Sequence, residues 1–414
     1  MLAECICQVS AKRYRICASV LVVAVGMCGG GVSLYAQGPP FDSGSHGEDG
    51  PLSFTTPSPQ PIFFDPTKYG KHIAGDTIFK FSTITIAKGV TVRLDSTNLP
   101  GPVYWLASGD VNIAGTLDLS GQQGYSVTGT IAERVFSIPG AGGFAGGPGG
   151  GTQVQAEPGA GPGGGAPGTG GPSANGKPGK FSGSTYLIPL IGGSGGGGAF
   201  CGSDNPQKYS VGGGAGGGAV LIASSTSITV TGAINAFGGN DTAALCAYGG
   251  AGSGGAIRLM ANSINFPQGS LNVSQGNGPV PGSTGLIRLE ATTLTLGGYI
   301  TGPYLTSIPA SVALPTTGPS AAKVVSVAGV PVNGNPFTFP SFQINTSNAV
   351  PVVIQGQNIP LGAIPTLTIL SETGPDQVIT APALTGTFAT STSTVNVTYP
   401  GGGSRGLVKV TWKD

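Results

Sequence analysis

The chain has 414 residues, of which 76 are glycine and 34 are proline, while charged residues make up 8% and the formal net charge is +1. This composition disfavours long helices, because glycine costs about 1 kcal/mol and proline about 3 kcal/mol relative to alanine in a helix interior. It also argues against nucleic acid as a partner, since there is no basic excess to neutralise phosphates, and against general disorder, since 39% of residues are hydrophobic.

The N-terminus has the order of a secretory signal peptide. Lys12, Arg13 and Arg15 precede an apolar run at 16–27, and a stretch of small residues ends at Ala36. The apolar run is shorter than the roughly 20 residues that span a bilayer. We therefore expect cleavage after Ala36 and a secreted or cell-surface location without a membrane span in the mature chain; a retained anchor is the alternative.

Cysteine usage agrees with export. Four of the six cysteines precede Ala36, which leaves Cys201 and Cys246 in the mature chain. An even pair in an oxidising compartment indicates a disulfide, which would contribute about 2–4 kcal/mol by restricting the unfolded chain. The alternative is two unrelated small core residues.

Two contrasting segments follow the signal peptide. Residues 37–75 are rich in proline, serine and glycine and predict an extended linker with little regular structure. Residues 77–94 alternate apolar and polar side chains and are rich in threonine, valine and isoleucine, which predicts strands.

A repeat dominates the next part of the chain. Its template is an apolar strand, a corner, an alternating strand, a glycine corner and a third alternating strand. The copies lie at 103–121, 219–238 and 256–276, with a shorter one at 286–298. One such unit cannot bury its apolar face alone, but stacked copies share a continuous core. We therefore expect a parallel β-helix; an antiparallel sandwich or a propeller blade is the alternative.

A large insertion interrupts the repeat. Residues 140–218 contain 32 of the 76 glycines and few apolar side chains. Such stretches form either flexible coil or extended backbone that packs where neighbouring segments approach closely. We expect loops that extend from the stacked repeats and are partly ordered.

Short alternating runs with turns between them characterise the C-terminal part. They predict a β-sandwich of immunoglobulin-like shape, without the cysteine pair of antibody domains. The expected organisation is a signal peptide (1–36), a linker (37–75), a β-helix (76–302) with the Gly-rich insertion at about 140–218, and a β-sandwich (303–414).

These patterns carry a resemblance. The segments 103–121, 219–238 and 256–276, with their Gly-rich interruptions, resemble exported bacterial surface proteins of the pectin-lyase-like parallel β-helix class. Residues 350–412 look like the all-β modules appended to bacterial extracellular proteins. The resemblance implies a fold and a cell-surface setting, and it transfers no catalytic residue.

Motifs of common cofactor and hydrolase sites are incomplete. A phosphate-loop-like run ends in Lys177, but Pro178 replaces the serine or threonine that the motif requires. A glycine-flanked Ser194 fits a nucleophile elbow, but the only histidines, His46 and His72, precede it in the chain. We therefore expect no cofactor and no metal site.

Charged residues on the repeat are the remaining candidates for a site. Arg258 and Arg288 occupy equivalent template positions, and Glu290 lies two residues further, so stacking would place all three on one outward face. Such a ladder could bind an acidic sugar; the alternative is a solvated face that offsets its own charge. Asp110 and Asp118 are expected at corners, where aspartate accepts backbone hydrogen bonds.

The sequence favours an exported structural or adhesive cell-surface protein without catalytic activity. One alternative is a carbohydrate-binding protein that uses exposed aromatic side chains such as Tyr104, Tyr209 or Tyr248. Another is a polysaccharide lyase or hydrolase on a β-helix scaffold. The expected partners are extracellular polysaccharide or cell-surface components.

Overall fold

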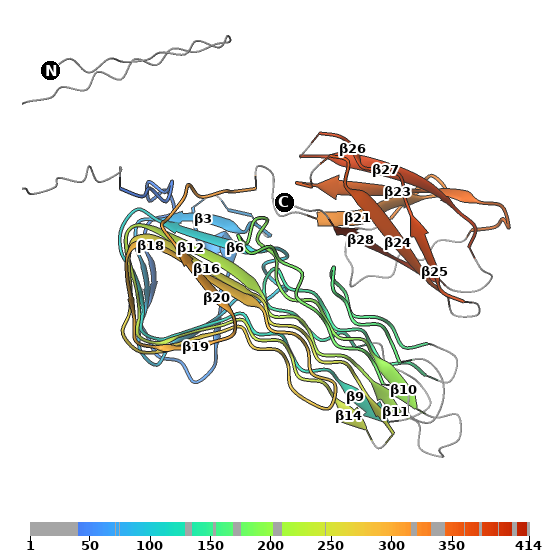
Figure 1. The fold of residues 1–414 in the computed structure, drawn as a ribbon, viewed down its shortest axis with the longest axis horizontal. Coiled ribbons are helices and arrows are strands. Elements are labelled where there is room, and N and C mark those ends of the chain that lie inside the picture. The colour runs from blue at the N-terminus through green and yellow to red at the C-terminus, as the bar shows by residue number, and fades with distance from the viewer. Residues whose placement is uncertain are drawn as a thin grey trace, which may run out of the picture. The chain divides into compact units, whose positions relative to one another are not determined.

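The computed structural model describes residues 40–411, apart from short gaps at 71, 74, 129–134, 152–154, 169–174, 202–208, 245, 316–320, 333–343, 360, 372–374, 388 and 400–403. The expected signal peptide therefore lies outside the described residues. The described chain is all-β: it forms strands β1 to β28 and a single short 3-10 helix, η1 (Pro66–Lys68), as the composition predicts (Figure 1). No helix in these ranges is long and apolar enough to cross a membrane.

A nine-stranded parallel sheet contains the first part of each repeat. Its strand order is β1-β4-β7-β12-β16-β18-β20; in addition, β6 pairs with β12 and β3 pairs with β6. The predicted copies stack in register, since Ala219 pairs with Ala256 and Ala256 pairs with Leu286. The strands are β1 (Leu52–Phe54), β3 (Ile78–Phe81), β4 (Ile84–Ile86), β6 (Val103–Ala107), β7 (Val111–Ile113), β12 (Ala219–Val230), β16 (Ala256–Phe266), β18 (Leu286–Leu296) and β20 (Tyr304–Ser307).

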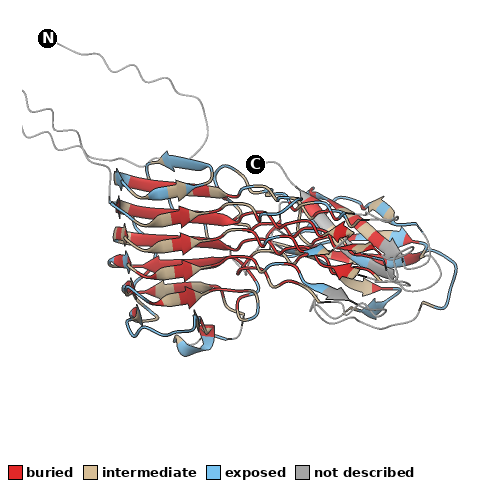
Figure 2. Cartoon of the chain, turned by 90° about the horizontal axis from the view of Figure 1, so that it is seen from below, coloured by how far each residue is buried: buried red, intermediate tan, exposed pale blue. Residues whose placement is uncertain are grey.

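A six-stranded parallel sheet contains the last strand of each repeat. It consists of β2 (Ile62–Phe63), β5 (Thr91–Arg93), β8 (Thr116–Asp118), β13 (Ala233–Asn235), β17 (Ser270–Asn272) and β19 (Tyr299–Thr301). The middle residues of β5, β8, β13 and β17 are buried and share one core with the inward side chains of the larger sheet. Figure 2 shows the strands as successive layers with buried centres.

The prediction of an extended linker at 37–75 is wrong for much of that segment. It contains β1, β2 and η1, and Leu52 and Phe64 are buried in the main core. The strands have only two or three residues, too few for an alternating pattern to show in the sequence. They are defined by parallel pairing with β4 and β5, which places them at the end of the stack.

The Gly-rich segments pack as extended, hydrogen-bonded backbone. Of the two alternatives that the sequence left open, this is the packed one and not the flexible coil. In segment 192–198 the hydrogen bonds recur every third residue. The N–H groups of Gly193 and Gly196 donate to the carbonyls of Gly217 and Gly214, at 2.7 and 2.9 Å. Three residues per turn without internal hydrogen bonds is the period of a polyproline II helix.

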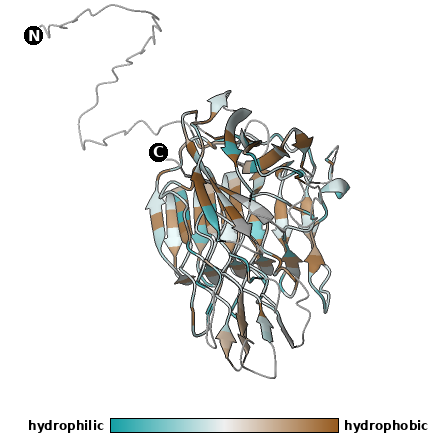
Figure 3. Ribbon diagram, turned by 90° about the vertical axis from the view of Figure 1, so that its right-hand side faces the viewer, coloured by the Kyte–Doolittle hydropathy of each residue, from teal (hydrophilic) through white to brown (hydrophobic). Residues whose placement is uncertain are grey.

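Segment 192–198 has neighbours on all sides. Backbone hydrogen bonds join it to residues within 214–217, 144–147, 157–160, 165–168 and 250–253, and to Lys177. We call this array the glycine bundle (residues 140–218 and 249–255, within the described ranges). Figure 3 shows hydrophobic residues concentrated in the strands, whereas the Gly-rich segments are largely pale. The bundle is therefore held mainly by its backbone.

Close backbone approach explains the glycine content. A Cβ atom on Gly196 would overlap the carbonyl oxygen of Gly250, and one on Gly213 would overlap that of Gly196. Because these obstacles are backbone atoms, no rotamer change can relieve the overlap. The same requirement for glycine governs the crowded axis of the collagen triple helix.

Two small antiparallel sheets lie at the far end of the glycine bundle in Figure 1. One contains β9 (Ser126–Thr128), β10 (Ala199–Cys201) and β11 (Tyr209–Val211), and the other β14 (Ala243–Ala244) and β15 (Ala247–Tyr248). A disulfide joins Cys201 to Cys246, whose Cα atoms are 5.8 Å apart. The predicted cysteine pairing is therefore confirmed.

The C-terminal part forms two antiparallel sheets. One contains β21 (Ala321–Val327), β22 (Val330–Pro331), β23 (Val350–Gln357), β26 (Thr385–Gly386) and β27 (Ser391–Val397), and the other β24 (Ile364–Ser371), β25 (Gln377–Thr380) and β28 (Ser404–Thr411). Val352 and Ile354 of one sheet share a buried core with Leu367 and Ile369 of the other. The expected boundary at 303 is too early, because β20 pairs with β18 in the parallel part.

Candidate functional site

The predicted Arg258–Arg288–Glu290 group is brought together as expected. Arg258 pairs in register with Arg288 on adjacent strands β16 and β18. The Nε atoms of both arginines donate to Oε1 of Glu290, each at 2.8 Å. The expectation of an exposed or solvated face is wrong, however, since Arg258 is 2% exposed and Glu290 is 1% exposed.

A second apolar layer covers this face of the sheet. Leu187 and Leu190 are buried against Leu221 and Met260, and the partly buried residues Phe181, Val312 and Leu314 pack against the same cluster. The alternating pattern of β16 and β18 shows which side chains point outward. It carries no information on which distant segment lies over them, so sequence reasoning missed the covering layer.

The ion cluster holds the covering segments in place. Arg288 donates to the carbonyl oxygen of Thr185 at 3.2 Å and to Oγ of Ser307 at 3.0 Å, and its guanidinium lies 5.2 Å from the ring centroid of Tyr186. The backbone N–H of Ala310 donates to Oε2 of Glu290 at 3.4 Å. The hydrogen-bonding groups of the cluster are thus directed at the protein itself. A role in binding an acidic sugar stays a prediction.

The aromatic candidates are not freely exposed. Tyr104 is buried under the covering layer, and burial raises the pKa of its hydroxyl, an effect that the positive charge of Arg258 opposes. Tyr209 and Tyr248 are partly buried in the small sheets beside the disulfide. The expectation that Tyr104 is available to a sugar ring is wrong, because the segment that packs over Leu106 and Leu221 also covers its ring.

Both corner aspartates bind groups of the protein. The carboxylate of Asp110 accepts hydrogen bonds from the hydroxyls of Thr226 and Ser227, at 2.7 and 2.8 Å, and these bonds lower its pKa. Asp118 accepts the backbone N–H of Ser120 at 3.0 Å and forms an ion pair with Arg93 at 2.7 Å. The expected hydrogen bond from backbone to aspartate is confirmed at Asp118.

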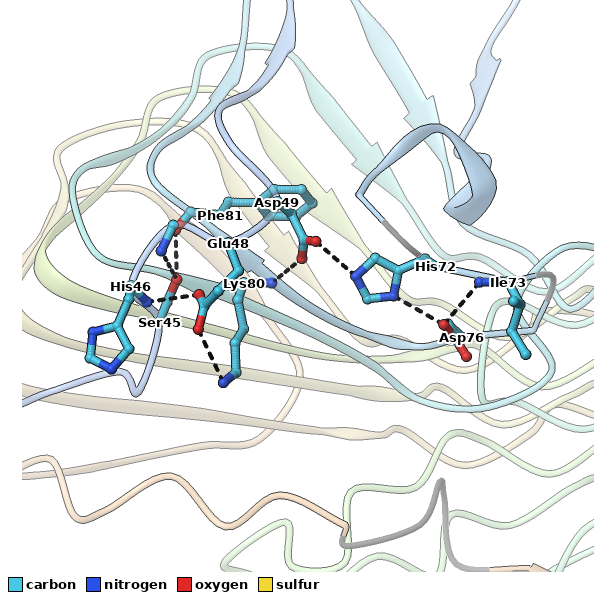
Figure 4. Close-up of polar contacts among 10 residues, drawn as sticks. Ser45, His46, Glu48, Asp49, His72, Ile73, Asp76, Lys80 and Phe81 are labelled. Atoms are coloured by element: carbon cyan, nitrogen blue, oxygen red, sulfur yellow. Dashed lines mark hydrogen bonds and ion pairs between the residues drawn. The ribbon is translucent and has the colours of Figure 1, made fainter.

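A histidine between two carboxylates was missed by sequence reasoning (Figure 4). Nε2 of His72 lies 2.9 Å from Oδ1 of Asp49, and Nδ1 lies 3.1 Å from Oδ2 of Asp76. The ring also packs on Phe79, with centroids 4.5 Å apart. Each ring nitrogen of His72 thus lies within hydrogen-bond distance of a different carboxylate.

The histidine cluster closes the edge of strand β3. Oδ2 of Asp49 accepts the backbone N–H of Lys80 at 2.6 Å, and the N–H of Asp49 donates to the carbonyl of Lys80 at 2.9 Å. Oγ of Ser45 donates to the carbonyl of Phe81 at 2.7 Å. Residues 45–50 therefore cap the first layer of the stack, and His72 ties this cap to Asp76.

Among the described residues, no group of three His, Cys, Asp or Glu side chains has an arrangement that could hold a metal ion. Asp49 and His72 are 23 residues apart in the chain, so spacing gave no signal. His72 and Asp76 are four residues apart, and their side chains meet only because the chain turns between them.

A pocket of about 400 Å³ opens on the surface of the glycine bundle. Both of its lysines, Lys177 and Lys180, are exposed, and the described residues that line it include no carboxylate. Lys177 and Lys180 are three residues apart, so a backbone with three residues per turn presents both side chains on the same side. The lining residues are Gly163, Gly164, Gly165, Ala166, Lys177, Pro178 and Lys180.

No family model matches the chain, and no curated protein or solved structure matches it significantly. The resemblance to pectin-lyase-like proteins therefore rests on the sequence pattern. No residue role is carried over from another protein, and the functional argument depends on the contacts described above.

Proposed function

We propose that the two parallel sheets form a parallel β-helix and that the C-terminal sheets form an immunoglobulin-like sandwich. The in-register pairing of successive repeats and the single core shared by the two parallel sheets support the first assignment. The buried core between the two antiparallel sheets supports the second.

We further propose that the protein is an exported structural or adhesive cell-surface protein without catalytic activity. The observation that carries this proposal is the glycine bundle. Its close backbone packing builds an ordered body largely from glycine, and its hydrogen bonds run between segments far apart in the chain. The buried ion cluster and the disulfide serve the same purpose, since each fixes one distant segment against another.

The test measures whether the protein binds to a surface and whether it releases products from that surface. Purified protein is applied to cell-wall material and to a panel of immobilised polysaccharides, and bound protein and soluble products are measured together. We expect retention on at least one surface without release of reducing ends or unsaturated sugars. Reproducible product release, lost on heat denaturation of the protein, would contradict the proposal.

A second candidate function is the binding of an acidic extracellular polysaccharide at the lysine pocket. Lys177 and Lys180 face the same side of one extended segment, and three residues of polyproline II helix span about 9 Å. Two cations at such a separation suit an extended polyanion. The bundle behind them holds their backbone, because the N–H of Gly197 donates to the carbonyl of Lys177 at 2.8 Å.

The lysine pocket is tested by affinity electrophoresis in gels that contain polygalacturonate or neutral dextran. The double variant Lys177→Ala/Lys180→Ala should lose retardation in polygalacturonate, and added salt should abolish retardation of the wild type. Lys88→Ala/Lys323→Ala is the matched control, because it removes the same charge from exposed positions elsewhere. Equal retardation of the two double variants would exclude this pocket.

A further inference from the structure

Both ends of the parallel stack have edge strands with a single partner, β1 and β2 at the first layer and β19 and β20 at the last, but the two ends differ in charge and in what covers them. At the first layer, residues 45–50 close the edge of β3 and the histidine cluster fixes them. At the last layer, β19 and β20 are the edge strands of their sheets in the strand order of the described residues. Each has a single partner, β17 and β18 respectively.

The last layer is apolar and uncharged. Tyr299 is 80% exposed and Ile308 is 78% exposed, and Leu296, Tyr304 and Leu305 are also exposed. Residues 291–308 contain no Asp, Glu, Lys, Arg or His. Proteins commonly protect sheet edges with charged side chains or proline, because an open edge templates pairing with another strand. Here only Pro303, between the two edge strands, offers such protection.

We propose that this end of the stack is an interface with a second copy of this chain, related by a two-fold axis. A two-fold axis reverses the strand direction, so identical edges of two copies meet antiparallel, a pairing that satisfies open N–H and C=O groups. Because neither edge carries charge, the edges meet without repulsion. Each copy buries five large apolar side chains: Leu296, Tyr299, Tyr304, Leu305 and Ile308.

Two features favour this closed pair over head-to-tail stacking. The opposite end also has edge strands, but β1 and β2 have only three and two residues. That end carries Glu48 and Lys80 beside Asp49, and its β3 edge is already hydrogen-bonded, so it is a poor partner for an uncharged edge. The chain beyond Ile308 also leaves the last layer. Ala310 binds Glu290, and Val312 packs against the covering layer on the outer face of the sheet.

The test measures the mass of the purified full-length protein by light scattering after size exclusion, over a range of concentrations. We expect a dimer that dissociates on dilution. The variant Tyr299→Lys/Ile308→Lys should be monomeric, because four lysines would meet across the interface. Val378→Lys and Ile73→Lys place a lysine at exposed apolar positions elsewhere and should leave the dimer intact.

Hydrogen exchange keeps the proposal testable if the double lysine variant fails to fold. In the wild type, the amides of 299–307 should exchange slowly above the dissociation concentration and faster below it. A wild-type monomer at every concentration would overturn the proposal, and slow exchange of 299–307 in that monomer would mean that the chain covers its own edge. Open-ended assemblies, or a dimer insensitive to lysines at 299 and 308, would also overturn it.

Discussion

At the scale of single residues, glycine is required wherever backbones cross at short distance. Gly196 shows this clearly, because the atoms nearest to an added Cβ would be backbone carbonyl atoms of Gly250 and Ala251. Composition alone predicts many turns and few helices, but it does not distinguish a glycine that turns the chain from one that admits a neighbouring segment. In the glycine bundle most glycines have the second role.

The variant Gly196→Ala should be strongly destabilised. Its methyl group would overlap the carbonyl oxygen of Gly250, and overpacking of a close-packed interior costs about 1–3 kcal/mol or more. Gly212→Ala is the control, because its methyl group would lie 3.3 Å from the nearest atoms, those of Tyr125. Denaturant unfolding should give a clearly lower free energy for Gly196→Ala than for Gly212→Ala. Equal values would contradict the packing described for the bundle.

Glu290→Gln should cost more stability than removal of an exposed carboxylate. It leaves Arg258 and Arg288 without an anion, and breaking a buried ion pair costs about 3–5 kcal/mol. The matched variant Glu48→Gln removes an exposed partner of Lys80, and such pairs contribute about 0–1 kcal/mol. Free energies of unfolding from urea titrations test this. A loss below 1 kcal/mol for Glu290→Gln would mean that the cluster does not hold the covering layer.

Asp241 should make the folded state less stable as the pH rises. Burial raises the pKa of its carboxyl above the ordinary 3.8, although the N–H of Val280 donates to it. A raised folded pKa means that the stabilising protonated form is lost as the pH increases from the unfolded value through the folded one. The melting temperature of Asp241→Asn, relative to wild type, should therefore increase over that range. A constant or decreasing difference would contradict the assignment.

At the scale of elements, the sequence pattern predicted the stacked strands and missed what covers or caps them. The repeats at 219, 256 and 286 align because each buried side chain recurs at the same place in each strand. The covering layer around Leu187 and Leu190 has no such period, since it packs from outside on a surface that other segments build. The positions of Arg258 and Arg288 were therefore predictable, but their burial was not.

The N-terminal cap was missed for a related reason. Strands β1 and β2 are too short to show a period, and the His72 cluster joins residues from separate turns of the chain. In contrast, the Cys201–Cys246 pair was predictable because elimination left only two cysteines after the expected signal peptide. Local patterns predict elements, whereas caps and coverings depend on contacts between distant segments.

The variant His72→Leu should loosen the cap without unfolding the stack. Leucine keeps an apolar contact with Phe79, but it removes the ring nitrogens that lie beside Asp49 and Asp76. Amide exchange in β3 should become faster, while exchange in β16 stays unchanged. His46→Leu is the control, since the side chain of His46 is exposed. Unchanged exchange in β3 would show that the cap holds without the histidine.

At the scale of the whole molecule, two ways of filling an interior occur in one chain. The parallel sheets bury large side chains such as Trp105, Phe79 and Phe81, whereas the glycine bundle packs backbone against backbone. The first is driven by burial of apolar surface. The second depends on hydrogen bonds between neighbouring segments and on the absence of side chains. A region whose composition also fits a flexible coil can thus be as extensively hydrogen-bonded as a sheet.

The most direct measurement is amide hydrogen exchange across 192–198 and its partners at 213–217, resolved by mass spectrometry or NMR. The packing described here predicts protection of these glycine amides comparable to that of β12 and β16, because each donates to a carbonyl of a neighbouring segment. Exchange at the rate of an unstructured peptide would contradict the glycine bundle and, with it, the proposed structural role.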